Sequence, residues 1–128
     1  MRILALDAGE ARCGCAVCDP TGTVVTPLEV VPRPDTRRGL DSLARLVKER
    51  EIEQIVVGLP LTLRGEEGDQ ARWTRRFAGR LSDRVDVPVA MHDERLTTRQ
   101  AERTGGQAAA DSRAAAHLLE AFLAGATR

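Results

Sequence analysis

Three acidic residues, far apart in the chain, have the types and positions needed for metal-ion chemistry. Asp7 ends the apolar run ILALD and is followed by a glycine turn at Gly9. A carboxylate at the end of a buried strand is costly unless it is paired, hydrogen-bonded or bound to a metal. Glu94 follows another apolar run, and Asp111 precedes an alanine- and leucine-rich stretch. We therefore expect Glu94 and Asp111 to be brought to Asp7.

The expected positions of these acids indicate what they could do. Asp7 and Glu94 both end strands, and ligand sites in open α/β sheets lie beyond the carboxyl ends of strands. Three carboxylates from separate segments repel one another unless a cation lies between them, and hard oxygen ligands suit Mg²⁺ or Mn²⁺. Two such ions about 3.5–4 Å apart can activate a water and stabilise the leaving oxygen of an in-line displacement. The pattern predicts a metal-dependent phosphodiesterase.

The acids also have simpler explanations. Asp111 can be a helix N-cap, and Glu94 can form an ion pair with Arg95 or Arg12.

Asp-x-Gly hairpins occur in actin-like kinases and chaperones too, but those folds bind nucleotide between two such domains. A third possibility is a non-catalytic nucleic-acid-binding or ribosome-assembly module that retains the acids without using them.

Hydrophobic periodicity predicts strands first and then alternating helices and strands. Strands are expected at 2–7, 12–18, 23–31, 52–59 and 87–93, and helices at 37–50, at 70–83, from Leu96 to about Arg103 and from Asp111 onward. Pro27 within the third strand suggests an edge or a bulge. Hairpin-linked strands followed by β-α units imply an α/β fold with a mixed five-stranded sheet flanked by helices, in a single domain over residues 1–128.

The composition is that of a soluble globular protein, since 42% of the 128 residues are hydrophobic and 30% are charged. No apolar run is long enough to span a bilayer, and the N-terminus enters a strand without a signal peptide, so we expect a cytoplasmic protein. The 19 basic residues balance 19 acidic residues. Overall charge therefore neither requires nor excludes a nucleic-acid partner.

Arginine dominates the basic residues, because Lys48 is the only lysine. The planar guanidinium suits bidentate phosphate contacts, although a coding bias toward arginine explains the excess as well. Arg72 and Arg76 share a helix face near the loop 58–61, so we treat them as candidate nucleic-acid contacts. A solvated helix face is the simpler interpretation.

Three cysteines, Cys13, Cys15 and Cys18, fall within the second expected strand. Their odd number argues against a disulfide framework. The spacing C-x-C-x-x-C raises the alternative of a zinc site, but no fourth ligand lies nearby in the sequence. We expect small hydrophobic core residues instead.

Four ordered motifs resemble the YqgF/RuvX family. They are DAGEARCG at 7–14, VGLPL at 57–61, DERLTT at 93–98 and DSRAA at 111–115. The resemblance covers roughly residues 3–124, and four motifs in one order are far more specific than any one of them. It implies an RNase H-like fold and a nuclease that matures the 5′ end of pre-16S ribosomal RNA, with Holliday junction resolution as the alternative.

The resemblance also implies the roles of particular residues. Asp7, Glu94 and Asp111 match the family's acidic, metal-dependent site, which is expected to use Mg²⁺ or Mn²⁺. Further site positions are the nucleic-acid-binding Arg12 and Arg95 and the loop residues Gly9, Gly58 and Pro60. A junction resolvase makes two coordinated cuts, so a homodimer is a possible assembly.

The sequence departs from the family pattern in three places. Ala11 stands where the family usually has a lysine, and Cys13 and Cys15 replace branched apolar residues. The segment between Glu94 and Asp111 is short, and GGQAAA before Asp111 offers no charge to a phosphate. Nucleic-acid binding would then depend on arginines elsewhere in the chain.

Overall fold

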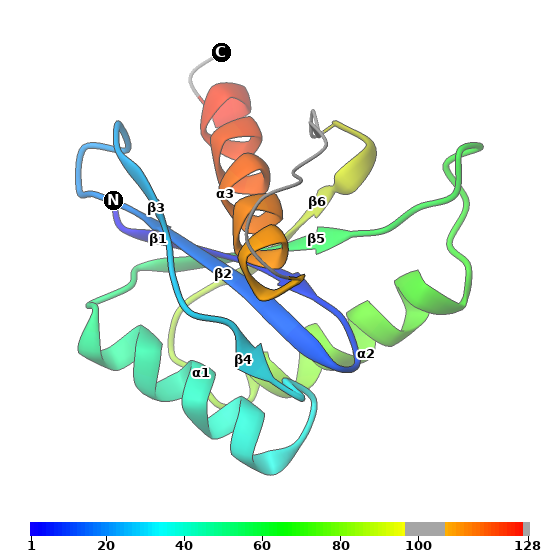
Figure 1. Ribbon diagram of the computed structural model, residues 1–128, viewed down its shortest axis with the longest axis horizontal. Coiled ribbons are helices and arrows are strands. Elements are labelled where there is room, and N and C mark those ends of the chain that lie inside the picture. The colour runs from blue at the N-terminus through cyan, green and yellow to red at the C-terminus, as the bar shows by residue number, and fades with distance from the viewer. Residues whose placement is uncertain (97–106, 127–128) are drawn as a thin grey trace.

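The computed structural model describes residues 1–96 and 107–126, which form a sheet covered by helices on both faces (Figure 1). In chain order the elements are β1 (Ile3–Ala8), β2 (Arg12–Cys18), β3 (Val25–Pro27), β4 (Val31–Pro32), α1 (Arg37–Glu49), β5 (Gln54–Leu59), α2 (Asp69–Ser82), β6 (Val89–Asp93), a 3₁₀ turn (Glu94–Leu96) and α3 (Gln107–Ala126).

The sheet is mixed, as expected. Its strand order is β3-β2-β1-β5-β6, and the two-residue β4 also pairs with β2. The hairpin β1–β2 is antiparallel, whereas β5 runs parallel to β1 and β6 runs parallel to β5. The carboxyl ends of β1, β5 and β6 therefore meet at one end of the sheet, the end at which Asp7 and Glu94 were expected.

Two expected boundaries were wrong. The single strand predicted at 23–31 is broken into β3 and β4, and Pro27 ends β3 at the edge of the sheet. The last helix begins at Gln107, so Asp111 lies inside α3 and is not its N-cap. Alanine has the highest helix propensity, and the three alanines before Asp111 extend the helix backwards. The short helix expected from Leu96 to Arg103 falls mostly outside the described residues.

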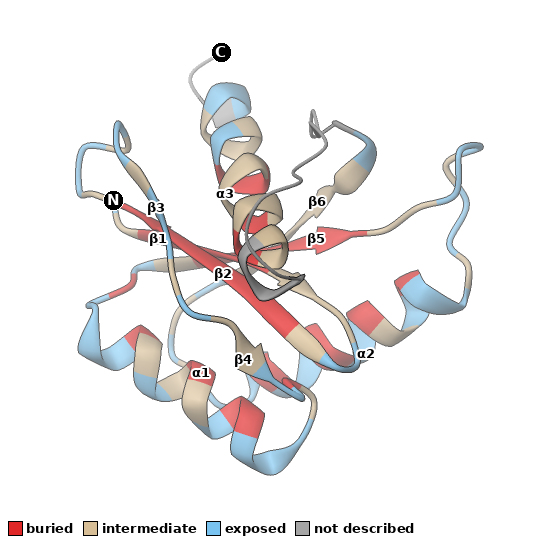
Figure 2. Cartoon of the chain, in the orientation of Figure 1, coloured by how far each residue is buried: buried red, intermediate tan, exposed pale blue. Residues whose placement is uncertain are grey.

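The sheet separates two cores, because alternate side chains of each strand point to opposite faces. Buried residues are red along β1, β2 and β5 and in patches on α1, α2 and α3 (Figure 2). On one face Ala115, Leu118 and Leu119 of α3 pack against the strands. On the other, buried leucines of α1 and the aromatic ring of Phe77 in α2 fill the space. Trp73 stacks on Phe77 with ring centroids 5.6 Å apart. The α3 face is the one that carries the acids.

The cysteines are buried and unbridged, as expected for core residues. A hydrogen bond with Cys15 and then burial raise the pKa of the Cys13 thiol well above its ordinary value, which keeps it unreactive. Within residues 1–96 and 107–126, no three His, Cys, Asp or Glu side chains form a group that could hold a metal as they stand. No helix in the same part of the chain is long and apolar enough to cross a membrane.

Candidate active site

Asp7 lies between two glycines on the neighbouring strands. Antiparallel pairing places Gly14 of β2 directly opposite Asp7. On the other side, Leu6 pairs with Val57, so the next position along β5, Gly58, lies beside Asp7. Residues in register share a face of the sheet. Since Ala5 belongs to the core beneath α3, Asp7 faces α3 as well. The carboxylate thus projects between two positions that carry no side chain, and the next position along the row is His92 of β6.

Gly14 allows the backbone of α3 to contact the sheet. A Cβ at this position would lie 2.0 Å from the carbonyl oxygen of Asp111 and 2.9 Å from the amide nitrogen of Ser112. No real side chain fits there, so the glycine determines how closely the helix approaches β2. Ser112 fixes the same turn of α3, because its hydroxyl donates to the carbonyl of Leu28 at 2.6 Å. Asp111 is in this way brought to the strand beside Asp7.

Gly58 provides the corresponding space for Glu94. A Cβ on Gly58 would lie 2.7 Å from Oε1 and 2.9 Å from Cγ of Glu94. The 3₁₀ turn after β6 therefore folds the Glu94 side chain back over β5, next to the strand that carries Asp7. The three predicted acids thus surround one row of the sheet, Gly14–Asp7–Gly58, although they come from β1, a turn and a helix.

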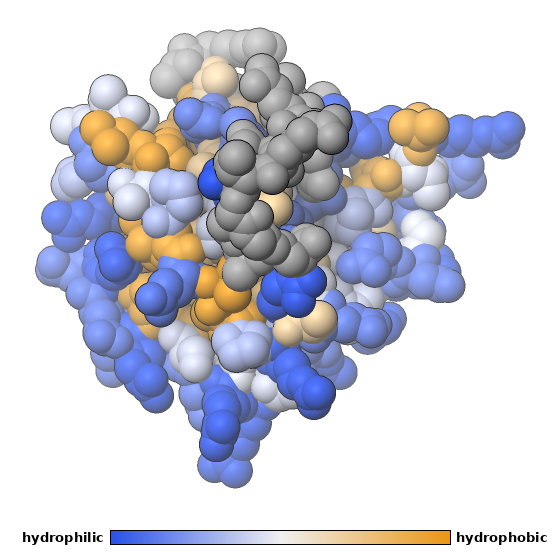
Figure 3. Space-filling view, viewed as in Figure 1, coloured by the Kyte–Doolittle hydropathy of each residue, from blue (hydrophilic) through white to orange (hydrophobic). Residues whose placement is uncertain are grey.

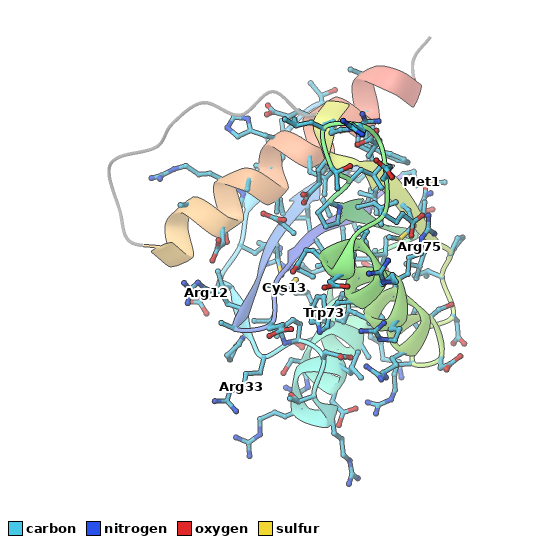
Figure 4. All side chains as sticks on the ribbon, turned by 90° about the vertical axis from the view of Figure 1, so that its right-hand side faces the viewer. Met1, Arg12, Cys13, Arg33, Trp73 and Arg75 are labelled. Carbon is cyan, nitrogen blue, oxygen red and sulfur yellow. The ribbon has the colours of Figure 1, made fainter. Side chains whose placement is uncertain are left out.

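Asp7 and Asp111 line one hollow of about 270 Å³, together with the β1–β2 turn and Arg12. Arg12 Nε donates to Asp111 Oδ2 at 2.6 Å, and both side chains are partly exposed. The turn is closed by a hydrogen bond from the Gly9 amide to the Arg12 carbonyl, at 2.9 Å. Figure 4 shows Arg12 near the N-terminal end of α3. With Glu10 of the turn, the hollow presents three carboxylates and one guanidinium, a combination suited to a cation and a phosphate.

The two arginines considered as partners of Glu94 both pair with other acids. Arg12 is paired with Asp111, as described, and Arg95 Nη2 lies 2.8 Å from Asp93 Oδ2. The hydrogen bond from Arg95 lowers the pKa of Asp93 below its ordinary value. Arg95 also donates to the Leu63 carbonyl at 3.4 Å. In this position Arg95 contacts the loop that begins at Pro60, directly after β5.

The remaining candidate arginines lie apart from the acids. Arg72 and Arg76 belong to α2, which packs on the sheet face opposite α3. Arg72 pairs with Asp69 and donates to the Glu67 carbonyl at 3.1 Å. Arg76 is exposed and forms no ion pair with any residue in the described ranges. The fold does not bring these two arginines to the hollow.

Gly14 is the functional position that sequence reasoning missed. A glycine in the interior of a strand often marks the close approach of another backbone. That signal was present, since the run RCGCAVC is otherwise suited to a strand. The sequence did not indicate which segment approaches Gly14, because Asp111 is distant from it in the chain.

Gly58→Ala tests the space left for Glu94. The three atoms nearest to the added methyl all belong to that side chain, so the carboxylate must move while the backbone can stay. We expect cleavage to fall about 100-fold, the typical effect of a displacement of about 1 Å at a catalytic site. The melting temperature should change little, since a flexible side chain yields cheaply. Unchanged cleavage rates in a folded variant would exclude Glu94 from the reaction.

Comparison with known proteins agrees with this geometry. The family model described as "RuvX: Holliday junction resolvase" matches residues 1–125. A relative from Chloroflexus aurantiacus, named "Putative pre-16S rRNA nuclease", is 46% identical over 101 residues, 79% of this chain and 66% of that protein. A relative of the same name from Syntrophomonas wolfei is 37% identical over 134 residues, 98% of this chain and 95% of that protein.

Among solved structures, Thermus thermophilus RuvC has a TM-score of 0.64 at 18% identity, covering 99% of this chain and 97% of that chain. The complex of T. thermophilus RuvC with a Holliday junction substrate gives a TM-score of 0.62, also at 18% identity, covering 99% of this chain and 96% of that one. At this identity the likeness establishes the fold, which is the RNase H-like fold that the sequence predicted.

Proposed function

This chain belongs to the RuvX family, and on that premise we propose that it is a metal-dependent endonuclease that hydrolyses phosphodiester bonds of structured nucleic acid. The observation that carries the proposal is the row Gly14–Asp7–Gly58, over which the fold places Asp111 and Glu94. Two carboxylates at the carboxyl ends of parallel strands, with a third on the helix packed over them, suit a hydrolytic centre for phosphate esters. The three must move closer together to hold one ion, since they form no metal-binding group as they stand.

The donor chemistry fits Mg²⁺ or Mn²⁺, because all three side chains offer hard oxygen ligands and the hollow leaves room for water. Asp7, Glu94 and Asp111 are the residues that would hold the ion. A divalent cation bound there supplies Lewis-acid polarisation of the phosphate and a water of lowered pKa. Asp111 is paired with Arg12 in this structure. Coordination by Asp111 would free the Arg12 guanidinium to bind a phosphate oxygen.

The favoured substrate is precursor 16S ribosomal RNA, because the two relatives are both named "Putative pre-16S rRNA nuclease". Cleavage at the 5′ end is what the family resemblance implies. Holliday junction resolution is the alternative, favoured by the family description. The alignment spans 66% of the length of the Chloroflexus aurantiacus relative. We place the enzyme in the cytoplasm and consider a homodimer as the assembly for the alternative reaction, because two strands would need two active sites.

A paired assay separates these functions. The purified protein is incubated with Mn²⁺ and either a precursor rRNA fragment or a four-way DNA junction, and products are mapped by length. Cleavage of the RNA alone supports rRNA maturation, and symmetric cuts in the junction support resolution. Binding of either substrate without cleavage, in Mg²⁺ as well as Mn²⁺, would contradict the proposal and favour a non-catalytic assembly module.

A further inference from the structure

Four exposed arginines lie along α1 and in the loop before it. We call Arg33, Arg37, Arg38 and Arg45 the α1 arginine cluster. Three of them line an open hollow of about 580 Å³ on the outer side of α1. Arg37 and Arg45 lie eight residues apart, so they share one face of the helix. The surface over this part of the molecule is almost wholly hydrophilic (Figure 3).

The nearby acids do not neutralise this cluster. Asp35 pairs with Arg80 of α2 at 2.5 Å, and Asp41 pairs with Arg84. None of the four cluster arginines forms an ion pair with an acid in the part of the chain that the structure describes. In a protein whose formal net charge is zero, four arginines that lack an ion pair within the described residues are therefore concentrated on α1 and the loop before it, and the hollow beside them holds one acid, Asp41.

The backbone holds Arg33 in a conformation that arginine rarely adopts. Its φ is +42°, in the left-handed region. A Cβ on Gly39 would lie 2.2 Å from the Arg33 carbonyl oxygen, so Gly39 allows the preceding loop to press against α1. The Arg33 amide donates to the Ala11 carbonyl at 2.9 Å. Strain of this kind persists where the surroundings impose it, and it occurs often at functional sites.

The same contact joins the cluster to the active-site hollow. Ala11 belongs to the β1–β2 turn that lines the hollow, and the next residue, Arg12, pairs in the sheet with Pro32. Arg12 and Arg33 project on the same side of the molecule in Figure 4. The β1–β2 turn thus links Arg12 of the hollow to Arg33 of the cluster, although α1 itself packs on the sheet face opposite α3.

We propose that the α1 arginine cluster binds the phosphate backbone of a double-stranded arm that extends from the cleavage site. The assignment rests on the proposed function, since it identifies where that substrate continues beyond the hollow. Guanidinium groups bind phosphate bidentately and without regard to sequence, which suits a contact that positions a duplex. The cluster supplies the positive charge that the segment before Asp111 lacks.

Arg37→Gln/Arg38→Gln tests this contact against a matched control at the C-terminal end of α1, Lys48→Gln/Arg50→Gln, in which Arg50 is the C-cap residue. Each variant loses two exposed positive charges, and both are made in an Asp7→Asn background to prevent cleavage. Binding of a duplex RNA and of a four-way DNA junction is measured by anisotropy across a salt series. We expect the first variant to bind about tenfold more weakly, with a salt slope reduced by about 2. The control should bind within about twofold of the parent.

Arg37→Lys/Arg38→Lys should retain most of the affinity and separate loss of charge from loss of structure. Equal weakening in both glutamine variants would overturn the inference, because it would indicate a general charge effect. Unchanged binding in Arg37→Gln/Arg38→Gln would also overturn the inference. An acidic protein would then be the alternative partner of the cluster. The proposed nuclease activity is tested separately with Asp7 intact. Absence of cleavage together with weakened binding would refute that activity while supporting the arginine contact.

Discussion

Asp7→Asn is expected to lower the rate of phosphodiester cleavage by on the order of 1,000-fold or more, with no loss of thermal stability. Asparagine keeps the shape of the side chain but removes the charged oxygen that would bind a divalent cation. Lewis-acid stabilisation is worth several kcal/mol in the transition state, and each 1.36 kcal/mol is tenfold in rate. Cleavage is measured with Mn²⁺ at saturating substrate, alongside thermal melting.

Stability should stay constant or rise, because removing one charge relieves the repulsion between neighbouring carboxylates in the metal-free protein. The wild-type protein should also melt at a higher temperature when Mn²⁺ is added, since the ion binds only the folded state. That increase should disappear in Asp7→Asn. Asp86→Asn removes the same charge from an exposed loop before β6 and should preserve both activity and the Mn²⁺ effect. Loss of activity only through unfolding of Asp7→Asn would count against a catalytic Asp7.

Gly14→Ala is expected to damage the fold and the activity together. The added Cβ would lie 2.0 Å from a backbone carbonyl of α3, and a helix backbone cannot rotate away as a side chain can. Overpacking in a close-packed interior typically costs about 1–3 kcal/mol. α3 must move off β2 to accommodate the methyl group, and this movement takes Asp111 away from Asp7. Melting temperature and cleavage rate should therefore both fall.

Gly79→Ala is the control for this substitution. Gly79 lies within α2, and an added Cβ there would meet nothing within 4 Å. The helix should gain up to about 1 kcal/mol from the higher propensity of alanine, with activity unchanged. If Gly14→Ala instead melted like the wild type and cleaved at the wild-type rate, the close contact between α3 and β2 would not be needed for the site.

The sequence was sufficient to predict the sheet and two of its acids, because the relevant signals are local. Asp7 stands out against the apolar strand that precedes it, and Glu94 follows a strand that must run parallel to the first. Parallel strands bring their carboxyl ends together, so the approximate location of the site followed from strand order. Membership of the family could be inferred because four motifs occur in one order.

The other features of the candidate site depend on how α3 packs against the sheet, which the sequence does not show. Asp111 was expected at a helix start but lies inside α3, because the alanines before it favour helix. Its ion pair with Arg12, the close contact at Gly14 and the partners of Arg95 all arise between segments distant in the chain. Arg72 and Arg76 seemed near the loop in sequence, yet they lie on the face opposite the acids.

The separation of Arg12 and Asp111 by 99 positions makes the candidate site depend on the last helix. Joining residues so distant closes a long loop, which is entropically costly before other contacts offset that cost. A chain whose α3 is not docked on the sheet would hold Asp7 without Asp111. The distribution of the acids between the first strand and the last helix thus makes the proposed activity depend on the docking of α3.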